Sequence, residues 1–242
     1  MSNKRIIKVC GLRDGDNMRQ VAELGVDWIG MIFWDKSPRN VTMIPTRAGI
    51  LPDRGSLPSS SSEGSVAQSV KRVGVFVDEM AQNIVTRVVN FGLDLVQLHG
   101  HESPTLIRNL RLTLDPDIRP GIKFIKAITV GSRDDVAAYK DYEDCVDYLL
   151  FDTRSDSVGG SGKQFDWQWL DAYDGHLPFL LSGGIGPDDA PRLRALFHND
   201  SQAVASGFPL DKCIGIDLNS RFEVEPGMKD IQKLKQFIDQ LA

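Results

Sequence analysis

Short apolar runs alternate with amphipathic stretches along most of the chain. Several runs, such as Tyr148-Leu149-Leu150-Phe151, are apolar almost throughout, which is typical of parallel strands that are covered on both faces. Between the runs, apolar residues recur at helical spacing. We expect strands at 6–10, 28–33, 72–77, 93–98, 122–128, 146–151, 179–181 and 202–205, and helices at 17–24, 80–91, 103–111, 132–139, 188–197 and 229–241.

The order of these elements predicts an α/β fold. Strands that alternate with helices favour a closed (β/α)8 or TIM barrel, and an open doubly wound sheet is the alternative. The 242 residues fit one such barrel, which usually needs roughly 250 residues. We therefore expect a single domain that spans residues 1–242.

One interval, residues 45–67, interrupts the alternation. It carries Pro45, Pro52 and Pro58 and the serine tract 59–62, so it cannot hold a regular helix of normal length. The second helix of the barrel is therefore expected to be degraded or replaced by a mobile Ser/Pro/Gly-rich excursion. We favour a tolerated insertion over a functional lid.

Charge and cysteine content narrow the class of protein. The chain has 28 Lys+Arg against 33 Asp+Glu, a net charge of -5 that argues against a nucleic-acid partner. It has neither a signal peptide nor an apolar run of membrane length, so we expect a cytoplasmic protein without a membrane partner. Its cysteines, Cys10, Cys145 and Cys213, are too few for a disulfide framework and too far apart for a zinc site. Nothing in the sequence decides between a monomer and a homodimer.

Candidate chemistry gathers at the carboxyl ends of the expected strands, where barrel enzymes carry their reactive groups. The first strand ends at Cys10, the second leads to Arg39, and the fourth carries Gln97 and ends at His99. Asp152 follows the sixth strand. Cys10 and Asp152 are therefore both expected to face the mouth of the barrel.

Two glycine-rich segments follow the sixth and seventh strands, and a polar segment, 217–221, follows the eighth. Glycine turns let backbone N–H groups approach an anion, and the polar segment is expected to form the short extra helix that completes many barrel phosphate sites. The sequence therefore predicts a small phosphorylated ligand. The candidate phosphate-binding residues are Gly160, Ser161, Gly162, Gly183, Gly184, Asn219 and Ser220.

Taken together, the motifs resemble the phosphoribosylanthranilate isomerase family of tryptophan biosynthesis. The resemblance is carried in order by Lys8-Val9-Cys10-Gly11, Ser37-Pro38-Arg39, Gln97-Leu98-His99-Gly100, Phe151-Asp152-Thr153 and Ser182-Gly183-Gly184-Ile185. It implies a (β/α)8 barrel that needs neither cofactor nor metal. It also implies conversion of N-(5-phosphoribosyl)anthranilate to 1-(2-carboxyphenylamino)-1-deoxyribulose 5-phosphate by an Amadori rearrangement.

The resemblance makes Cys10 the general base and Asp152 the general acid. A free thiol has a pKa of about 8.5, so Cys10 needs nearby positive charge to act as a thiolate. Lys8 lies on the same face of the strand, and we expect it either to favour the thiolate or simply to fill the barrel interior. Asp152 has to hold a proton, which calls for an apolar setting such as Leu150 and Phe151 could provide.

The resemblance also assigns the substrate-binding residues. Arg39 is expected to hold the anthranilate carboxylate, because its planar guanidinium matches carboxylate geometry, and an ordinary surface arginine is the alternative. Gln97 and His99 are expected to line the pocket. One departure concerns the last phosphate segment, where Arg221 replaces a glycine that is common in the family, which puts the geometry there in doubt.

Two other functions remain open from the sequence. One is a sugar-phosphate isomerase of the histidine-pathway type, although such enzymes use a pair of aspartates and the first strand here ends in Cys10. The other is a catalytically silent barrel that only binds a phosphorylated metabolite. The presence of both Cys10 and Asp152 argues against the silent barrel.

Overall fold

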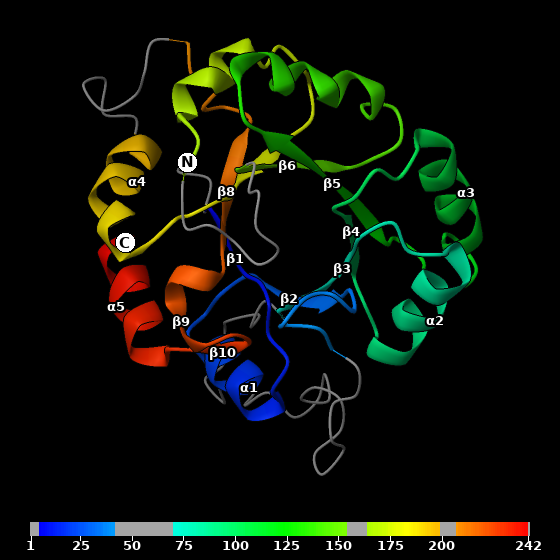
Figure 1. The fold of residues 1–242 in the computed structure, drawn as a ribbon, viewed down its shortest axis with the longest axis horizontal. Coiled ribbons are helices and arrows are strands. Elements are labelled where there is room, and N and C mark those ends of the chain that lie inside the picture. The colour runs from blue at the N-terminus through cyan, green and yellow to red at the C-terminus, as the bar shows by residue number, and fades with distance from the viewer. Residues whose placement is uncertain (1–4, 42–69, 154–163, 199–206, 242) are drawn as a thin grey trace, which may run out of the picture.

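The computed structural model describes residues 5–41, 70–153, 164–198 and 207–241. Eight parallel strands close into a barrel in the order β1-β2-β3-β4-β5-β6-β7-β8, and the helices lie outside it (Figure 1). The strands are β1 (Ile6–Val9), β2 (Trp28–Phe33), β3 (Lys71–Phe76), β4 (Leu95–Leu98), β5 (Lys123–Val130), β6 (Tyr148–Thr153), β7 (Phe179–Leu181) and β8 (Cys213–Leu218). The predicted (β/α)8 barrel is confirmed.

The eighth strand does not lie where the sequence analysis placed it. Strand β8 is Cys213–Leu218, and it pairs with both β1 and β7 to close the barrel. Gly215 and Asp217 interrupt its apolar pattern, so the sequence alone does not mark it as a strand. The barrel is closed by β8 and not by a strand at 202–205, so that prediction is wrong, and the whole of that range lies outside the described residues. Asp217 and Leu218 belong to β8 and not to a following helix.

The segments between strands are more varied than in a regular barrel. The α-helices are α1 (Gly15–Glu23), α2 (Ala81–Phe91), α3 (Pro104–Leu114), α4 (Ala190–Phe197) and α5 (Ile231–Leu241). Turns of 3₁₀-helix are η1 (Arg133–Asp141), η2 (Trp167–Ala172), η3 (Pro187–Asp189) and η4 (Ser220–Phe222), and a two-stranded ribbon joins β9 (Glu223–Glu225) to β10 (Met228–Lys229). The helix expected at 132–139 is therefore a 3₁₀-helix. The excursion expected at 45–67 lies outside the described residues.

Side chains of each strand alternate between two apolar layers. One fills the barrel interior, and the other packs between the strands and the surrounding helices. The interior layer consists of Cys10, Trp28, Val73, Val75, Leu95, Ile125, Ala127, Leu150 and Leu180. On β6, Leu150 belongs to the interior while Leu149 and Phe151 belong to the outer layer, so period-two alternation places Asp152 on the interior face.

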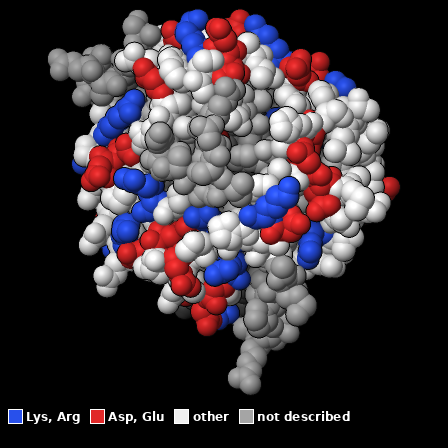
Figure 2. Space-filling model, in the orientation of Figure 1, with Lys and Arg blue, Asp and Glu red and all other residues white. Residues whose placement is uncertain are grey.

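The described surface carries charges of both signs. On the face in Figure 2, Lys and Arg side chains alternate with Asp and Glu around the rim of the barrel, and the described residues of this face form no continuous basic patch. None of the described helices is both long enough and apolar enough to cross a membrane.

Candidate active site

Cys10 lies at the carboxyl end of β1, inside the mouth of the barrel. It is 3% exposed, and its backbone N–H donates to the carbonyl of Leu218 on β8 at 2.8 Å. Gly30 of β2 makes room for the thiol, because a Cβ atom there would lie 2.8 Å from Cys10 Sγ. The sulfur therefore lies against β2, while the backbone of Cys10 is bonded to β8.

Lys8 and Asp217 form a fully buried ion pair beside the thiol. Lys8 Nζ donates to Asp217 Oδ1 at 2.8 Å, and the two residues face each other in the β1–β8 pairing. Burial lowers the pKa of the Lys8 ammonium, but Asp217 and Cys10 outweigh this effect and raise it above its ordinary value. Lys8 thus stays charged next to Cys10.

The charge on Lys8 does not make Cys10 a ready thiolate in the ligand-free protein. Burial raises the pKa of the Cys10 thiol, Lys8 and Lys229 lower it, and Asp217 raises it again, so the pKa lies above its ordinary value. Lys8 therefore acts in the expected direction without overcoming desolvation. The thiol therefore keeps its proton more firmly than a free thiol does.

Replacing Lys8 by methionine is expected to move the alkylation of Cys10 to higher pH. The ammonium favours the thiolate, so its loss raises the pKa of Cys10 further. Peptide mass spectrometry after iodoacetamide treatment follows Cys10 separately from the other two cysteines. Lys123→Met, at the opposite end of the barrel, is the control. An unchanged profile would show that Lys8 only fills the barrel interior.

A second polar group, Gln97, His99 and Asp152, lines the mouth across β4 and β6. Gln97 Nε2 lies 3.0 Å from His99 Nδ1, and His99 Nε2 lies 3.1 Å from Asp152 Oδ2. One ring nitrogen of His99 thus faces the amide of Gln97, and the other faces the carboxyl of Asp152. Gln97 and His99 thus hold Asp152 by a chain of hydrogen bonds.

The setting of Asp152 differs from the apolar one that we expected. Its side chain is 25% exposed, accepts from His99 and, through Oδ1, from the backbone N–H of Thr153 at 2.9 Å. Leu150 lies one interior layer below, but Phe151 faces the outer layer. The expectation failed because strand alternation points the residue before Asp152 away from it.

Asp217 connects the two groups electrostatically. Burial raises the pKa of its carboxyl, Lys8 lowers it, and the negative charge of Asp152 raises it again. His99, like Lys8, lowers the pKa of the Asp217 carboxyl. Asp217 therefore interacts electrostatically with both the thiol end and the carboxyl end of the site.

Arg39 is buried in an ion-paired cluster with Glu223 and Lys229. Its Nε donates to Glu223 Oε1 at 2.9 Å and its Nη2 to Oε2 at 2.6 Å, while Lys229 Nζ donates to Oε1 at 2.6 Å. The side chains are 7%, 5% and 0% exposed, so Arg39 is not an ordinary surface arginine. Burial raises the pKa of Glu223, but the two cations outweigh it and hold that pKa below its usual range.

Gly11 joins this cluster to Cys10. It adopts a φ of +76°, and a Cβ atom there would lie 2.7 Å from Arg39 Cδ and 2.5 Å from Asn219 Oδ1. A side chain at this position would therefore be strained in its backbone and would also meet both neighbours. Arg39 and Asn219 lie against the residue that directly follows Cys10.

Part of the expected phosphate site can be located. Gly183 and Gly184, after β7, have φ values of +86° and +66°, as expected for a turn that only glycine enters easily. A Cβ atom at Gly183 would lie 2.6 Å from the backbone nitrogen of Thr153. Gly160, Ser161 and Gly162 lie outside the described residues.

The last phosphate segment differs in detail from the prediction. The short helix is η4, with Asn219 before it and Ser220 as its first residue. Asn219 does not cap η4 with its side chain, because its Oδ1 accepts from Lys229 Nζ at 2.7 Å. Arg221 lies beside Gly186, where a Cβ atom would be 3.0 Å from its Nε, and so adds positive charge near the turn after β7.

Sequence reasoning missed three charged residues of the site, namely Asp217, Glu223 and Lys229. Asp217 was missed because strand β8 itself was not predicted. Alternation along that strand places Asp217 on the interior face. Glu223 and Lys229 meet only through the β9–β10 ribbon, which has no strong sequence signal. Among the described residues, no group of His, Cys, Asp and Glu has the arrangement of a metal site.

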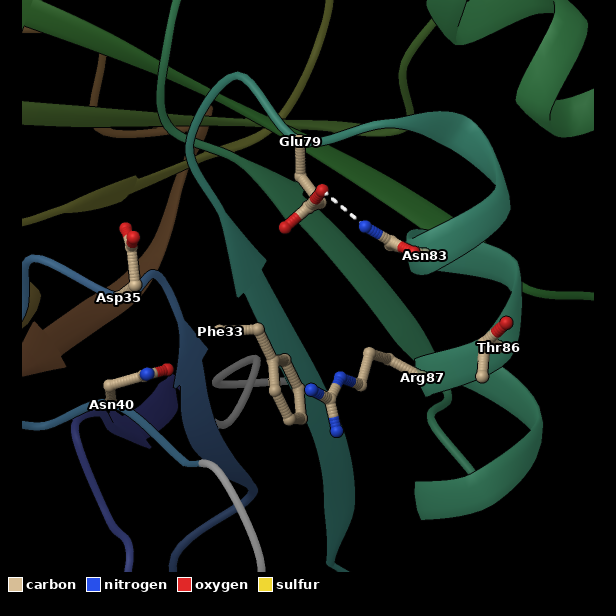
Figure 3. A pocket seen from close by; sticks show the side chains of 7 residues that line it. All are labelled: Phe33, Asp35, Asn40, Glu79, Asn83, Thr86 and Arg87. Atoms are coloured by element: carbon tan, nitrogen blue, oxygen red, sulfur yellow. Dashed lines mark hydrogen bonds between the residues drawn. The ribbon is translucent and has the colours of Figure 1, made fainter.

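A separate cavity of about 370 Å³ opens between β2 and α2, outside the barrel wall (Figure 3). It is lined by Phe33, Asp35, Asn40, Glu79, Asn83, Thr86 and Arg87. Phe33 belongs to the outer layer, and the Arg87 guanidinium lies 5.3 Å from its ring centre. None of the residues of the Cys10 or Asp152 groups lines this cavity, so it is distinct from the candidate site.

Comparisons with known proteins point to one family. The family model described as N-(5'phosphoribosyl)anthranilate (PRA) isomerase matches residues 7–240. The N-(5'-phosphoribosyl)anthranilate isomerase of Parabacteroides distasonis is 42% identical over 236 residues, which cover 98% of this chain and 93% of the relative. The crystal structure of the phosphoribosyl anthranilate isomerase of Thermotoga maritima is similar, with a TM-score of 0.68 and 28% identity over 98% of each chain.

A further solved structure of this kind contains a ligand. It is a phosphoribosyl anthranilate isomerase in complex with reduced 1-(o-carboxyphenylamino)-1-deoxyribulose 5-phosphate, with a TM-score of 0.65 and 25% identity over 98% of each chain. The family model spans nearly the whole chain, and the Parabacteroides relative covers it at high identity. The chain therefore belongs to the N-(5'-phosphoribosyl)anthranilate isomerase family.

Proposed function

We propose that the barrel formed by this chain converts N-(5-phosphoribosyl)anthranilate to 1-(2-carboxyphenylamino)-1-deoxyribulose 5-phosphate, a step of tryptophan biosynthesis. One observation carries the proposal beyond family membership. Cys10, directly after β1, and Asp152 on β6 both face the barrel mouth, and the buried Lys8–Asp217 pair links them electrostatically. A general base and a general acid thus flank one space.

Asp152 is the general acid for ring opening. Its protonated carboxyl gives a proton to the furanose ring oxygen, and the C1–O bond breaks with its electron pair going to that oxygen. The nitrogen lone pair of the anthranilate forms the C=N bond, which leaves a protonated Schiff base. His99 supports this role, because its hydrogen bond fixes the carboxyl at 3.1 Å.

Cys10 is the general base for the next step. The iminium makes the C2 proton acidic, and its positive charge beside the sulfur lowers the pKa of a thiol that burial otherwise raises. The thiol first gives its proton to solvent. The resulting thiolate takes the C2 proton, the electron pair of the C2–H bond forms the C1=C2 bond, and the iminium pair returns to nitrogen. The resulting enolamine tautomerises to the ketone, as C1 gains a proton and the C2 hydroxyl loses its proton to form the C2=O bond. The substrate's own nitrogen accepts the electrons, so the chemistry requires no cofactor.

The two ends of the substrate match the charges around the mouth. The guanidinium of Arg39 suits the anthranilate carboxylate, and Glu223 fixes its plane through hydrogen bonds from Nε and Nη2. The phosphate fits the turn of Gly183 and Gly184 with the segment of Asn219 and Ser220. Gln97 and His99 would lie against the ribose portion.

Replacing Arg39 by methionine is expected to raise KM by about tenfold or more while changing kcat much less. The anthranilate carboxylate does not take part in the bonds that change, so Arg39 is expected to stabilise the bound substrate and the transition state equally. Steady-state kinetics separate the two constants. Arg13→Met, which removes an exposed arginine at the same end of the barrel, is the control. A fall in kcat with unchanged KM would contradict the carboxylate-binding role.

The proposed activity is tested by following anthranilate fluorescence with phosphoribosylanthranilate generated in situ. We expect turnover at a rate proportional to the concentration of the protein. The aminoaldose phosphate of the histidine pathway is assayed in parallel, because it reports on the alternative isomerase. Turnover of that compound alone would establish the alternative, and turnover of neither would contradict the proposed function.

A further inference from the structure

A second buried ion pair, Lys126 and Glu102, lies behind the active site on the outer side of the barrel wall. Lys126 Nζ is 3.0 Å from Glu102 Oε2, and the side chains are 3% and 0% exposed. Lys126 is the β5 residue that faces outward between the interior residues Ile125 and Ala127. The pair therefore touches none of the interior groups directly.

Lys126 holds the backbone on both sides of His99. Its Nζ donates to the carbonyl of Leu98 at 3.3 Å and to the carbonyl of Gly100 at 2.5 Å. The backbone N–H of His99 itself donates to the carbonyl of Phe76 on β3 at 2.8 Å. Three contacts thus fix the short stretch from which the His99 ring reaches Asp152.

Glu102 ties the same stretch to the loop that follows β3. Its Oε1 accepts from the backbone N–H of Asp78 at 2.9 Å, and its Oε2 accepts from that of Gly100 at 3.0 Å. Asp78 has a φ of +49°, a region that is uncommon for residues other than glycine, so this loop is held in one particular conformation. Tyr142 Oη donates to the Glu102 carbonyl at 3.2 Å.

Stability alone is a weak reason for this pair, because a buried ion pair often contributes no more than apolar residues of the same size. Its contacts instead converge on the residues around His99, whose ring positions the carboxyl of Asp152. We propose that Lys126 and Glu102 are positioning residues that fix His99, and through it Asp152, for proton transfer. The role in turnover rests on the proposed function, whereas the effect on His99 does not.

Lys126→Met is expected to lower kcat by about 10- to 100-fold, because small misplacements of a reacting group have effects of that size. KM should stay within about twofold, since the groups proposed for the carboxylate and the phosphate are untouched. Lys123→Met is the matched control. It removes a lysine from the same strand whose ion pair with Asp147, at 2.9 Å, lies at the amino end. Its kcat should be unchanged.

The second readout is the ¹⁵N NMR spectrum of ligand-free protein labelled in its four histidines. The His99 ring signals, assigned with His99→Gln, should shift in Lys126→Met and stay in place in Lys123→Met. If Lys126→Met does not fold, the same two measurements are made on the double variant Lys126→Met/Glu102→Gln. It leaves no unpaired charge in the interior and keeps an acceptor for the backbone N–H groups of Asp78 and Gly100.

Whichever of the two Lys126 variants folds, the proposal requires it to show both a lower kcat and a shift of the His99 signals. Normal kcat, or unmoved His99 signals, would overturn it. An inactive wild-type protein would contradict the proposed function instead, and the His99 signals would still test whether the pair holds this residue.

Discussion

Cys10→Ala is expected to lower kcat by about 10² to 10⁴-fold, with a much smaller change in KM. The C2 proton of the Schiff base has to leave, and the thiol at the end of β1 is the group assigned to take it. Its neighbours Lys8 and Asp217 are engaged with each other at 2.8 Å, and Lys8 stays protonated. Steady-state fluorescence kinetics measure the effect.

Cys10→Ser is the matched variant for this prediction. It keeps a side chain of similar size against Gly30, but a hydroxyl is far harder to ionise than a thiol. We expect its kcat to be nearly as low as that of Cys10→Ala, with a similar Tm to the wild type. Full activity in Cys10→Ala would rule out the base assignment.

Asp152→Asn is expected to lower kcat by a similar factor of about 10² to 10⁴. Asparagine keeps the shape of the side chain and a hydrogen-bond acceptor for His99, but it cannot give a proton to the ring oxygen. KM should change little, because neither the carboxylate nor the phosphate of the substrate contacts this residue in the proposed arrangement.

The control for this variant is Asp35→Asn. Asp35 is an exposed carboxylate that follows β2 at the same end of the barrel and has no part in the proposed chemistry. Its kcat should equal that of the wild type. If Asp152→Asn retained kcat within a few-fold, another group would have to open the ring.

Much of the fold could be predicted because strands of a parallel barrel are buried on both faces and read as apolar runs. Strand β8 was not predicted because Gly215 and Asp217 interrupt its run of apolar residues. Both residues are there for reasons that the linear pattern does not reveal. Gly215 packs against the backbone of Ile6, and Asp217 pairs with Lys8 across the closing seam.

Only those features of the site that depend on the end of a single strand could be predicted from the sequence. Cys10 and Asp152 could be placed at the mouth because period-two alternation fixes the face on which each lies. Their electrostatics could not be predicted, because the pKa of Cys10 depends on the balance of burial against charges from β1, β8 and β10. Likewise, the partner of Arg39 is Glu223, far along the chain, which only tertiary structure brings near.

A single-turnover experiment tests most directly whether Cys10 and Asp152 are the base and acid of one reaction. Phosphoribosylanthranilate is mixed with excess wild type, Cys10→Ala or Asp152→Asn, and the decay of anthranilate fluorescence is recorded, so that product release does not limit the rate. We predict rapid decay with the wild type and a decay slower by about 10² to 10⁴-fold with each variant, while both keep the wild-type Tm. Decay at the wild-type rate with either folded variant would contradict the account.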